Sequence, residues 1–169
     1  TSRMTKVITD KRQQGKVDHA IQDMLRERIF GIACGYPDCN DAKSMSRDPV
    51  MKLMCDRSPI KGDALASQPT LSRFENVIRR TELLRMAYAI TDTVLEQEYR
   101  NRQERLPRRI TIDMDPTEDP TYGGQQFTFF NGYYNNYCYL PMVTTIQFDR
   151  ESHQYLVAPV LRPGNAKGS

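Results

Sequence analysis

The hydrophobic positions follow a helical spacing in the N-terminal part of the chain. Over residues 18–33 apolar side chains recur every three or four positions, which is the spacing of one helix face, and Gly35 and Pro37 follow as stop signals. Asp48 followed by Pro49 is typical of a helix N-cap with proline in the first turn. We therefore predict one amphipathic helix over residues 18–33 and a shorter one after Asp48.

A third helix start is indicated by Ser67 and Pro69, and a longer helix by the apolar spacing that begins at Thr81. The polar run 96–105 that follows is interpreted as a linker. Two short helices joined by a turn suit a helix-turn-helix-like DNA reader, although a helical bundle with a solvated polar face has the same pattern. In the DNA-binding interpretation, the residues that would face a groove are Gln68, Thr70, Ser72 and Arg73.

Beyond residue 106 the spacing changes from helical to alternating. Residues 108–115 alternate strictly, so that Asp113 and Asp115 fall on the face opposite the apolar positions, and Pro116 ends the strand. Residues 137–148 and 155–161 alternate as well and are separated by a polar turn, which predicts a hairpin. The pattern predicts an α+β chain with a helical region over residues 1–105 and three strands within 106–169.

Composition narrows the class of protein without identifying it. The chain is 38% hydrophobic and 27% charged, with a formal net charge of +3 and a pI near 8.7, which permits a nucleic-acid partner. Residues 1–6 lack the apolar core of a signal peptide, and no long apolar run predicts a membrane span. These two observations make a cytoplasmic location the expectation. The four cysteines form no CxxC pair, so we expect reduced thiols and no zinc site.

The chemistry that the sequence offers is concentrated at the end of the first strand. Asp113 and Asp115 lie on one strand face, about 6 to 7 Å apart at their Cα atoms, so their charges repel unless water, a cation or a substrate compensates. One interpretation is a Mg²⁺ site for phosphoryl transfer, and another is an exposed strand end solvated by water. With Thr117 the pair also matches the motif of haloacid-dehalogenase-type phosphatases, in which Asp113 would be the nucleophile and Asp115 the general acid and base.

The surrounding residues resemble one family. Residues 110–126, 129–134 and 137–141 are similar to the opening of the catalytic domain of bacterial insertion-sequence transposases of the DDE type. Residues 35–41, 47–49 and 65–76 resemble the N-terminal helical region of that family, and residues 161–165 resemble the end of its third strand. The resemblance extends from about residue 17 to 169, and it favours a transposase over the phosphatase, which would need further motifs downstream.

This resemblance implies an RNase-H-like catalytic domain with the first catalytic acid at the end of the first strand. Asp115, in its D-x-T setting with Thr117, is the expected catalytic residue and ligand of Mg²⁺, for which Mn²⁺ can substitute, and Asp113 is the second choice for both roles. The family's second Asp and its Glu cannot be placed here, so we expect an N-terminal fragment with an incomplete RNase-H-like sheet.

The partner implied by the resemblance is double-stranded DNA carrying the transposon inverted repeats. Candidate phosphate contacts are Arg79, Arg80, Arg108 and Arg109, although a solvated linker would have the same charges. The alternative to a catalytic role is a non-catalytic fragment that occupies transposon ends or pairs with full-length transposase as an inhibitor. A homodimer is a further candidate partner arrangement. An aromatic run could either stack unpaired bases or pack a core and a hairpin; it consists of Phe127, Phe129, Phe130, Tyr133, Tyr134, Tyr137 and Tyr139.

The isolated chain is predicted not to cut DNA, because a single acid cannot hold the two metal ions that assist attack and departure in an in-line displacement. Supercoiled plasmid incubated with Mg²⁺ or Mn²⁺ should remain un-nicked. Nicking that disappears in Asp115→Ala would contradict this prediction.

Overall fold

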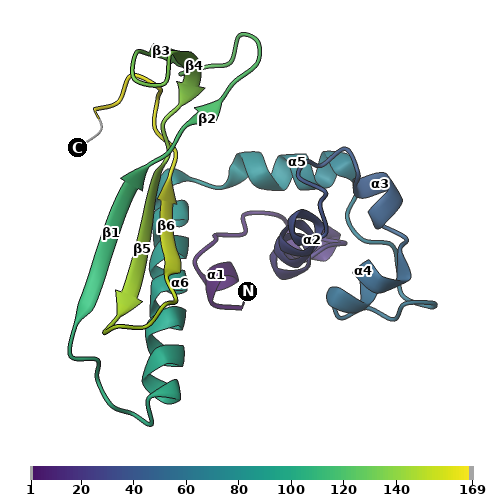
Figure 1. Cartoon of the computed structure of the whole chain (residues 1–169). Coiled ribbons are helices and arrows are strands. Elements are labelled where there is room, and N and C mark those ends of the chain that lie inside the picture. Colours follow the sequence, from purple (N-terminus) through teal and green to yellow (C-terminus); the bar gives the residue numbers. More distant parts are fainter. Residues whose placement is uncertain (1, 168–169) are drawn as a thin grey trace. The chain divides into compact units, whose positions relative to one another are not determined.

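The computed structural model describes residues 2–167, and the chain divides into two compact units, Thr1–Met86 and Ala87–Ser169 (Figure 1). Within the described residues the first unit is helical, and the second combines the later part of a long helix with two small antiparallel sheets. The predicted α+β class is confirmed.

The helical unit is organised around α2. Its described elements are α1 (Ser2–Lys6), the 3₁₀ helix η1 (Gln14–Lys16), α2 (Ile21–Ala33), α3 (Ala42–Met45), α4 (Pro49–Met54), α5 (Gln68–Val77) and the start of α6 (Arg80–Asn101). Helices α1, α4 and α5 all pack against α2. The predicted cap of α4 is confirmed, because the Asp48 carboxylate accepts from the Val50 and Met51 amides at 2.8 and 2.9 Å.

Two apolar clusters and a set of buried polar contacts hold this unit together. Met24 and Leu25 of α2 pack with Leu71 and Phe74 of α5, while a second cluster surrounds Met51. Two charged residues of α2 are also buried, Glu27 at 1% and Arg28 at 7% exposure. Their side chains bind backbone groups of the loops that surround α2.

Glu27 and Arg28 replace lost hydration by direct hydrogen bonds. Glu27 Oε2 accepts from the Ala66 amide at 2.9 Å, and Arg28 donates to the carbonyl oxygens of Pro37 and Asp38 and to the Glu75 carboxylate. The second oxygen of Glu27 has no partner within the described residues. Burial raises the pKa of Glu27 to about 7, although the Ala66 amide and the nearby arginines act in the opposite direction.

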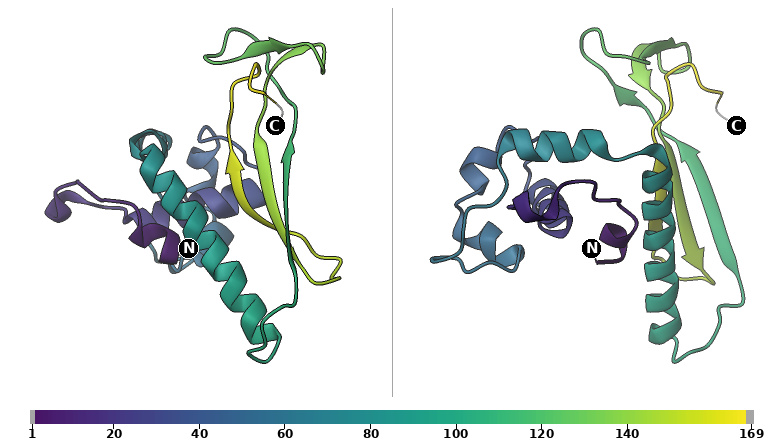
Figure 2. Two further views of the ribbon diagram at one scale, coloured as in Figure 1. Left: turned by 90° about the vertical axis from the view of Figure 1, so that its left-hand side faces the viewer. Right: turned by 180° about the vertical axis from the view of Figure 1, so that it is seen from behind.

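The second unit contains one longer and one shorter sheet, which Figure 2 shows from two sides. Its strands are β1 (Ile110–Pro116), β2 (Asp119–Pro120), β3 (Phe129–Asn131), β4 (Asn136–Tyr139), β5 (Met142–Phe148) and β6 (Tyr155–Val160). The sheet orders are β1-β5-β6 and β2-β4-β3, with antiparallel pairs throughout. The predicted hairpin is confirmed as β5–β6, and its core of Ile146, Phe148 and Val157 packs against Val94 of α6.

Two local predictions are wrong. Helix α6 continues to Asn101 through residues expected to form a linker, because Glu98 is buried there and accepts from Tyr155, while Arg102 binds Asp149 and Glu151 in the turn between β5 and β6. The strand expected over residues 137–148 is divided at Leu140 and Pro141, so that β4 and β5 belong to different sheets. Proline has no amide hydrogen for a ladder, and the Leu140 amide donates instead to the Arg162 carbonyl at 3.0 Å. The change from helix to strand falls between Asn101 and Ile110, and the functions assigned to the two regions remain predictions.

The buried Glu27 carboxyl should make stability depend on pH. Because its folded pKa of about 7 exceeds its ordinary value of 4.5, protonation favours the folded state, and this contribution is lost as the pH rises from 4.5 through 7. The free energy of unfolding should therefore fall by about 1 to 3 kcal/mol over this window, at about 1.4 kcal/mol per pKa unit. Glu27→Gln should remove most of this slope in chemical unfolding series at several pH values.

Asp63→Asn is the matched control, since Asp63 is exposed in the same unit. Equal slopes in the wild-type protein and Glu27→Gln would show that Glu27 is not the titrating group.

Candidate functional site

The start of β1 is fixed by one arginine and one aspartate. Arg102, just after α6, binds the carboxylates of Glu98 at 2.5 Å, of Asp149 at 2.7 Å and of Glu151. This guanidinium joins the end of the helix to the turn between β5 and β6. Because the Arg102 side chain is 20% exposed, solvent screens these ion pairs only in part.

Asp149 continues the connection to β1 itself. Its Oδ1 accepts from the Arg108 and Arg109 amides, both at 2.9 Å, and its own amide donates to the Arg109 carbonyl at 2.8 Å. Burial alone would raise the pKa of Asp149, but these amides and Arg102 outweigh it and hold the pKa below its ordinary value. The first residues of β1 are therefore held beside the end of β5.

The β1–β5 register determines where the two candidate acids lie. Asp113 pairs with Thr145 and Asp115 with Val143, so both carboxylates share a sheet face with uncharged neighbours. Both acids are exposed, and neither carboxylate forms a hydrogen bond or ion pair within residues 2–167. Beyond Pro116 the pairing continues through the Thr117 amide, which donates to the Pro141 carbonyl at 2.9 Å.

The charge around these acids is one-sided. No Lys or Arg occurs in the sequence between Arg109 and Arg150, whereas that segment carries five acids: Asp113, Asp115, Glu118, Asp119 and Asp149. The acids of this segment favour a bound cation, and one cation that the structure brings near the end of β1 from elsewhere in the chain is Arg162, which donates to the Leu140 carbonyl at 3.0 Å. The acid pair thus has the oxygen donors and the unmet charge that suit a hard divalent cation.

Asp113 and Asp115 do not form a complete metal cage by themselves. Within the described residues no three His, Cys, Asp or Glu side chains lie close enough to hold one ion. Strand β1 is also an edge strand, since the order of its sheet is β1-β5-β6. Its apolar side chains Ile112 and Met114 are 64% and 63% exposed, which is unusual for the inward positions of a covered sheet.

The residues predicted to bind DNA are distributed over both units. Gln68, Thr70, Ser72 and Arg73 lie on α5, Arg79 directly precedes α6, and Arg80 is the first residue of α6. Arg108 and Arg109 belong to the second unit, where Arg109 also donates to the Asp149 carbonyl at 3.1 Å. Arg73, Arg79, Arg80 and Arg108 are exposed, as a phosphate contact requires.

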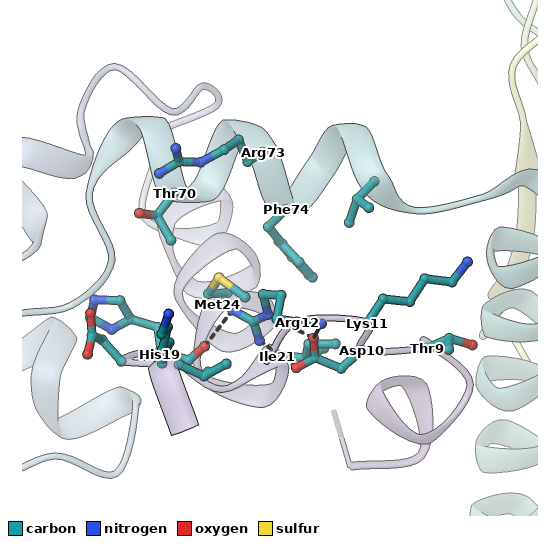
Figure 3. Close-up of a pocket in the computed structure, with 14 residues that line it drawn as sticks. Thr9, Asp10, Lys11, Arg12, His19, Ile21, Met24, Thr70, Arg73 and Phe74 are labelled. Atoms are coloured by element: carbon teal, nitrogen blue, oxygen red, sulfur yellow. Dashed lines mark hydrogen bonds and ion pairs between the residues drawn. The ribbon is translucent and has the colours of Figure 1, made fainter. Parts of the chain in front are cut away.

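The structure brings two of these residues to a cavity that sequence reasoning missed (Figure 3). Thr70 and Arg73 of α5 line a space of about 480 Å³, together with Lys11 and Lys16. The run 11–16 contains three basic residues and a glycine, which could have marked it as a cationic loop. That this run lines a cavity together with α5 could not be read from local spacing.

The aromatic run does not form a core. Tyr133 is 88% exposed, Phe127 is 68% exposed and Tyr137 is 60% exposed. Hairpin packing is present, because Phe130 of β3 and Tyr137 of β4 form an edge-to-face pair with ring centroids 5.5 Å apart.

Comparison with known proteins identifies the family. The family described as transposase DDE domain group 1 matches residues 1–169, whereas no curated protein and no solved structure matches the chain. Members of this family act on DNA and generally use divalent metal ions. Among the helices described here, none combines the length and the apolar character needed to cross a membrane. Since the family match covers the chain from end to end, the protein belongs to the DDE transposases of group 1.

Proposed function

We propose that the protein serves in cut-and-join reactions at the inverted repeats of an insertion sequence. In this proposal the helical unit binds double-stranded DNA, and Asp115 contributes to a Mg²⁺ site for phosphoryl transfer. The observation that carries the proposal is the pair of exposed, unpaired carboxylates on one face of β1, in a chain of this transposase family.

Asp115 is the stronger of the two candidate ligands. It is the last acid of β1. The strand ends at the next residue, Pro116, and the Thr117 amide then donates to the Pro141 carbonyl. Asp113, one pleat earlier on the same face, adds negative charge that favours a cation at Asp115. When bound, Mg²⁺ would stabilise charge on phosphate oxygens and lower the pKa of a bound water.

The antiparallel order β1-β5-β6 is compatible with the start of an RNase-H-like sheet. In such a sheet the acid-bearing first strand requires a neighbour on both sides, and β1 has one on the β5 side only. The open edge and the exposed Ile112 and Met114 support a further strand at this position. We infer that the carboxylates that complete the site come from a segment that pairs with this edge.

A non-catalytic role is the second candidate. It is favoured by the finding that the acids within the described residues provide two carboxylates on β1 and no group of three. In that role the protein would occupy transposon ends or pair with a complete transposase. The two roles share the DNA contact and differ in whether Asp115 matters.

Metal binding by the acid pair is directly measurable. Mn²⁺ titrated into ¹⁵N-labelled protein should broaden the amide signals of residues 113–115, of Thr117, and of Val143 and Thr145, which lie opposite the pair on β5. Asp115→Asn should weaken this binding by about tenfold or more, since about 1.4 kcal/mol of lost attraction corresponds to tenfold. Broadening that spreads evenly over the acidic residues of the chain would argue against a site on β1.

Asp92→Asn is the matched control for this titration. Asp92 is exposed on α6 in the same unit and belongs to neither β1 nor β5. The variant changes net charge by the same amount and should leave the broadening unchanged.

DNA binding should be electrostatic and carried by the helical unit. Affinity for a duplex with the element's inverted repeat should fall steeply between about 50 and 200 mM salt, and each lost phosphate contact should reduce the salt slope by about 0.9. The double variant Arg79→Gln and Arg80→Gln should reduce both the affinity and the slope in fluorescence anisotropy. Lys43→Gln, an exposed cation on α3, is the control, and affinity that does not respond to salt would refute an electrostatic contact.

A further inference from the structure

The cavity of the helical unit has an apolar floor and a cationic rim. Ile21 and Met24 of α2 and Phe74 of α5 form the floor, and Figure 3 shows Phe74 pointing from α5 into this space. The rim carries the cations Lys11, Lys16 and Arg73. A ligand that fills this space must combine a flat or compact apolar body with negative charge.

Internal ion pairs fix the loop that forms the rim. Arg12 binds the Asp10 carboxylate through Nε at 2.8 Å and Nη2 at 2.7 Å, and its Nη1 donates to the His19 carbonyl at 2.9 Å. The Arg12 guanidinium holds the pKa of Asp10 well below its usual range. Asp10 and Arg12 therefore neutralise each other and close the loop from residue 10 to residue 19.

The remaining rim charges are free to meet a ligand. Lys11, Lys16 and Arg73 are exposed and form no ion pair within residues 2–167, so three cations face one unpaired acid, Asp18. His19 adds no positive charge at neutral pH, because its burial and the Arg57 charge lower its pKa. The rim is thus suited to one or two phosphate groups.

We propose that this cavity holds one unpaired nucleotide of a DNA strand, with its base on the apolar floor and its flanking phosphates at Lys11, Lys16 and Arg73. The volume of about 480 Å³ accommodates a base with its sugar but not a paired duplex. The hydroxyls of Thr9 and Thr70 and the Asp18 carboxylate supply groups for the polar edge of a base. The inference rests on the proposed DNA-binding function and assigns a specific subsite to it.

The first experiment uses deoxyadenosine monophosphate as the probe in an NMR titration of the whole chain. The mononucleotide should shift amides of residues 9–19 and 70–77, whereas adenosine and inorganic phosphate should each bind at least tenfold more weakly. Arg73→Gln should reduce mononucleotide binding by severalfold, and Lys43→Gln should not. Equal binding of inorganic phosphate, with the same response to the variants, would mean an anion site only and would overturn the proposal.

Filling the cavity provides a test that removes no charge. Val77 lines the cavity and is 62% exposed, so Val77→Trp can place an indole in this space with little cost to the fold, which thermal unfolding will check. Val50→Trp is the matched control, because Val50 is 63% exposed on α4 and does not line this cavity. Val77→Trp should abolish mononucleotide binding, and unchanged binding would overturn the proposal.

A duplex with a single unpaired 2-aminopurine separates this inference from the proposed function. Binding should raise the fluorescence of the 2-aminopurine with wild-type protein and with Val50→Trp, but not with Val77→Trp. If duplex binds without preference for the unpaired base and without an effect of Val77→Trp, this inference fails and the proposed function stands. If no duplex binds at all, the proposed DNA-binding function fails with it.

Discussion

A single guanidinium, that of Arg102, connects the three parts of the second unit that determine where the candidate acids lie. It binds Glu98 in the last turn of α6 and both Asp149 and Glu151 in the turn between β5 and β6. Asp149 in turn caps the amides that begin β1. Because strand pairing is periodic, this anchor at one end of β1 sets the register that places Asp113 opposite Thr145 and Asp115 opposite Val143 at the other end.

The contacts of Arg102 and Asp149 gather arginines at the first residues of β1. Arg102, Arg108 and Arg109 lie at the α6 end of β1, while residues 110–149 carry carboxylates and no cation in the sequence. An acid pair left exposed in this way contributes nothing to stability, since its mutual repulsion opposes folding. Exposed carboxylates without protein partners can accept a cation, and the transposase family to which the chain belongs generally uses divalent metal ions.

In the helical unit, the contacts that hold the loops come from two buried side chains of α2. On helix α2, Glu27 accepts from the Ala66 amide and Arg28 donates to the carbonyls of Pro37 and Asp38. These buried polar side chains hold the loops that contain these residues against α2. The same helix supplies Ile21 and Met24 to the cavity floor. The site that we propose for an unpaired nucleotide therefore depends on the polar contacts of α2 with Ala66, which precedes α5, and with Glu75 of α5.

Local sequence patterns determined the cap at Asp48, the alternation that makes β1 a strand, and the shared face of Asp113 and Asp115, because each of these depends on residues only a few positions apart. Tertiary structure alone decided that α6 continues to Asn101, that the chain leaves one sheet for another at Pro141, and that Lys11 and Lys16 join Arg73 around a cavity. The aromatic run shows the same limit, since its composition could not tell pairing across strands from burial in a core. Each of these outcomes depends on contacts between residues far apart in the chain, and such contacts cannot be predicted from the spacing of neighbouring residues.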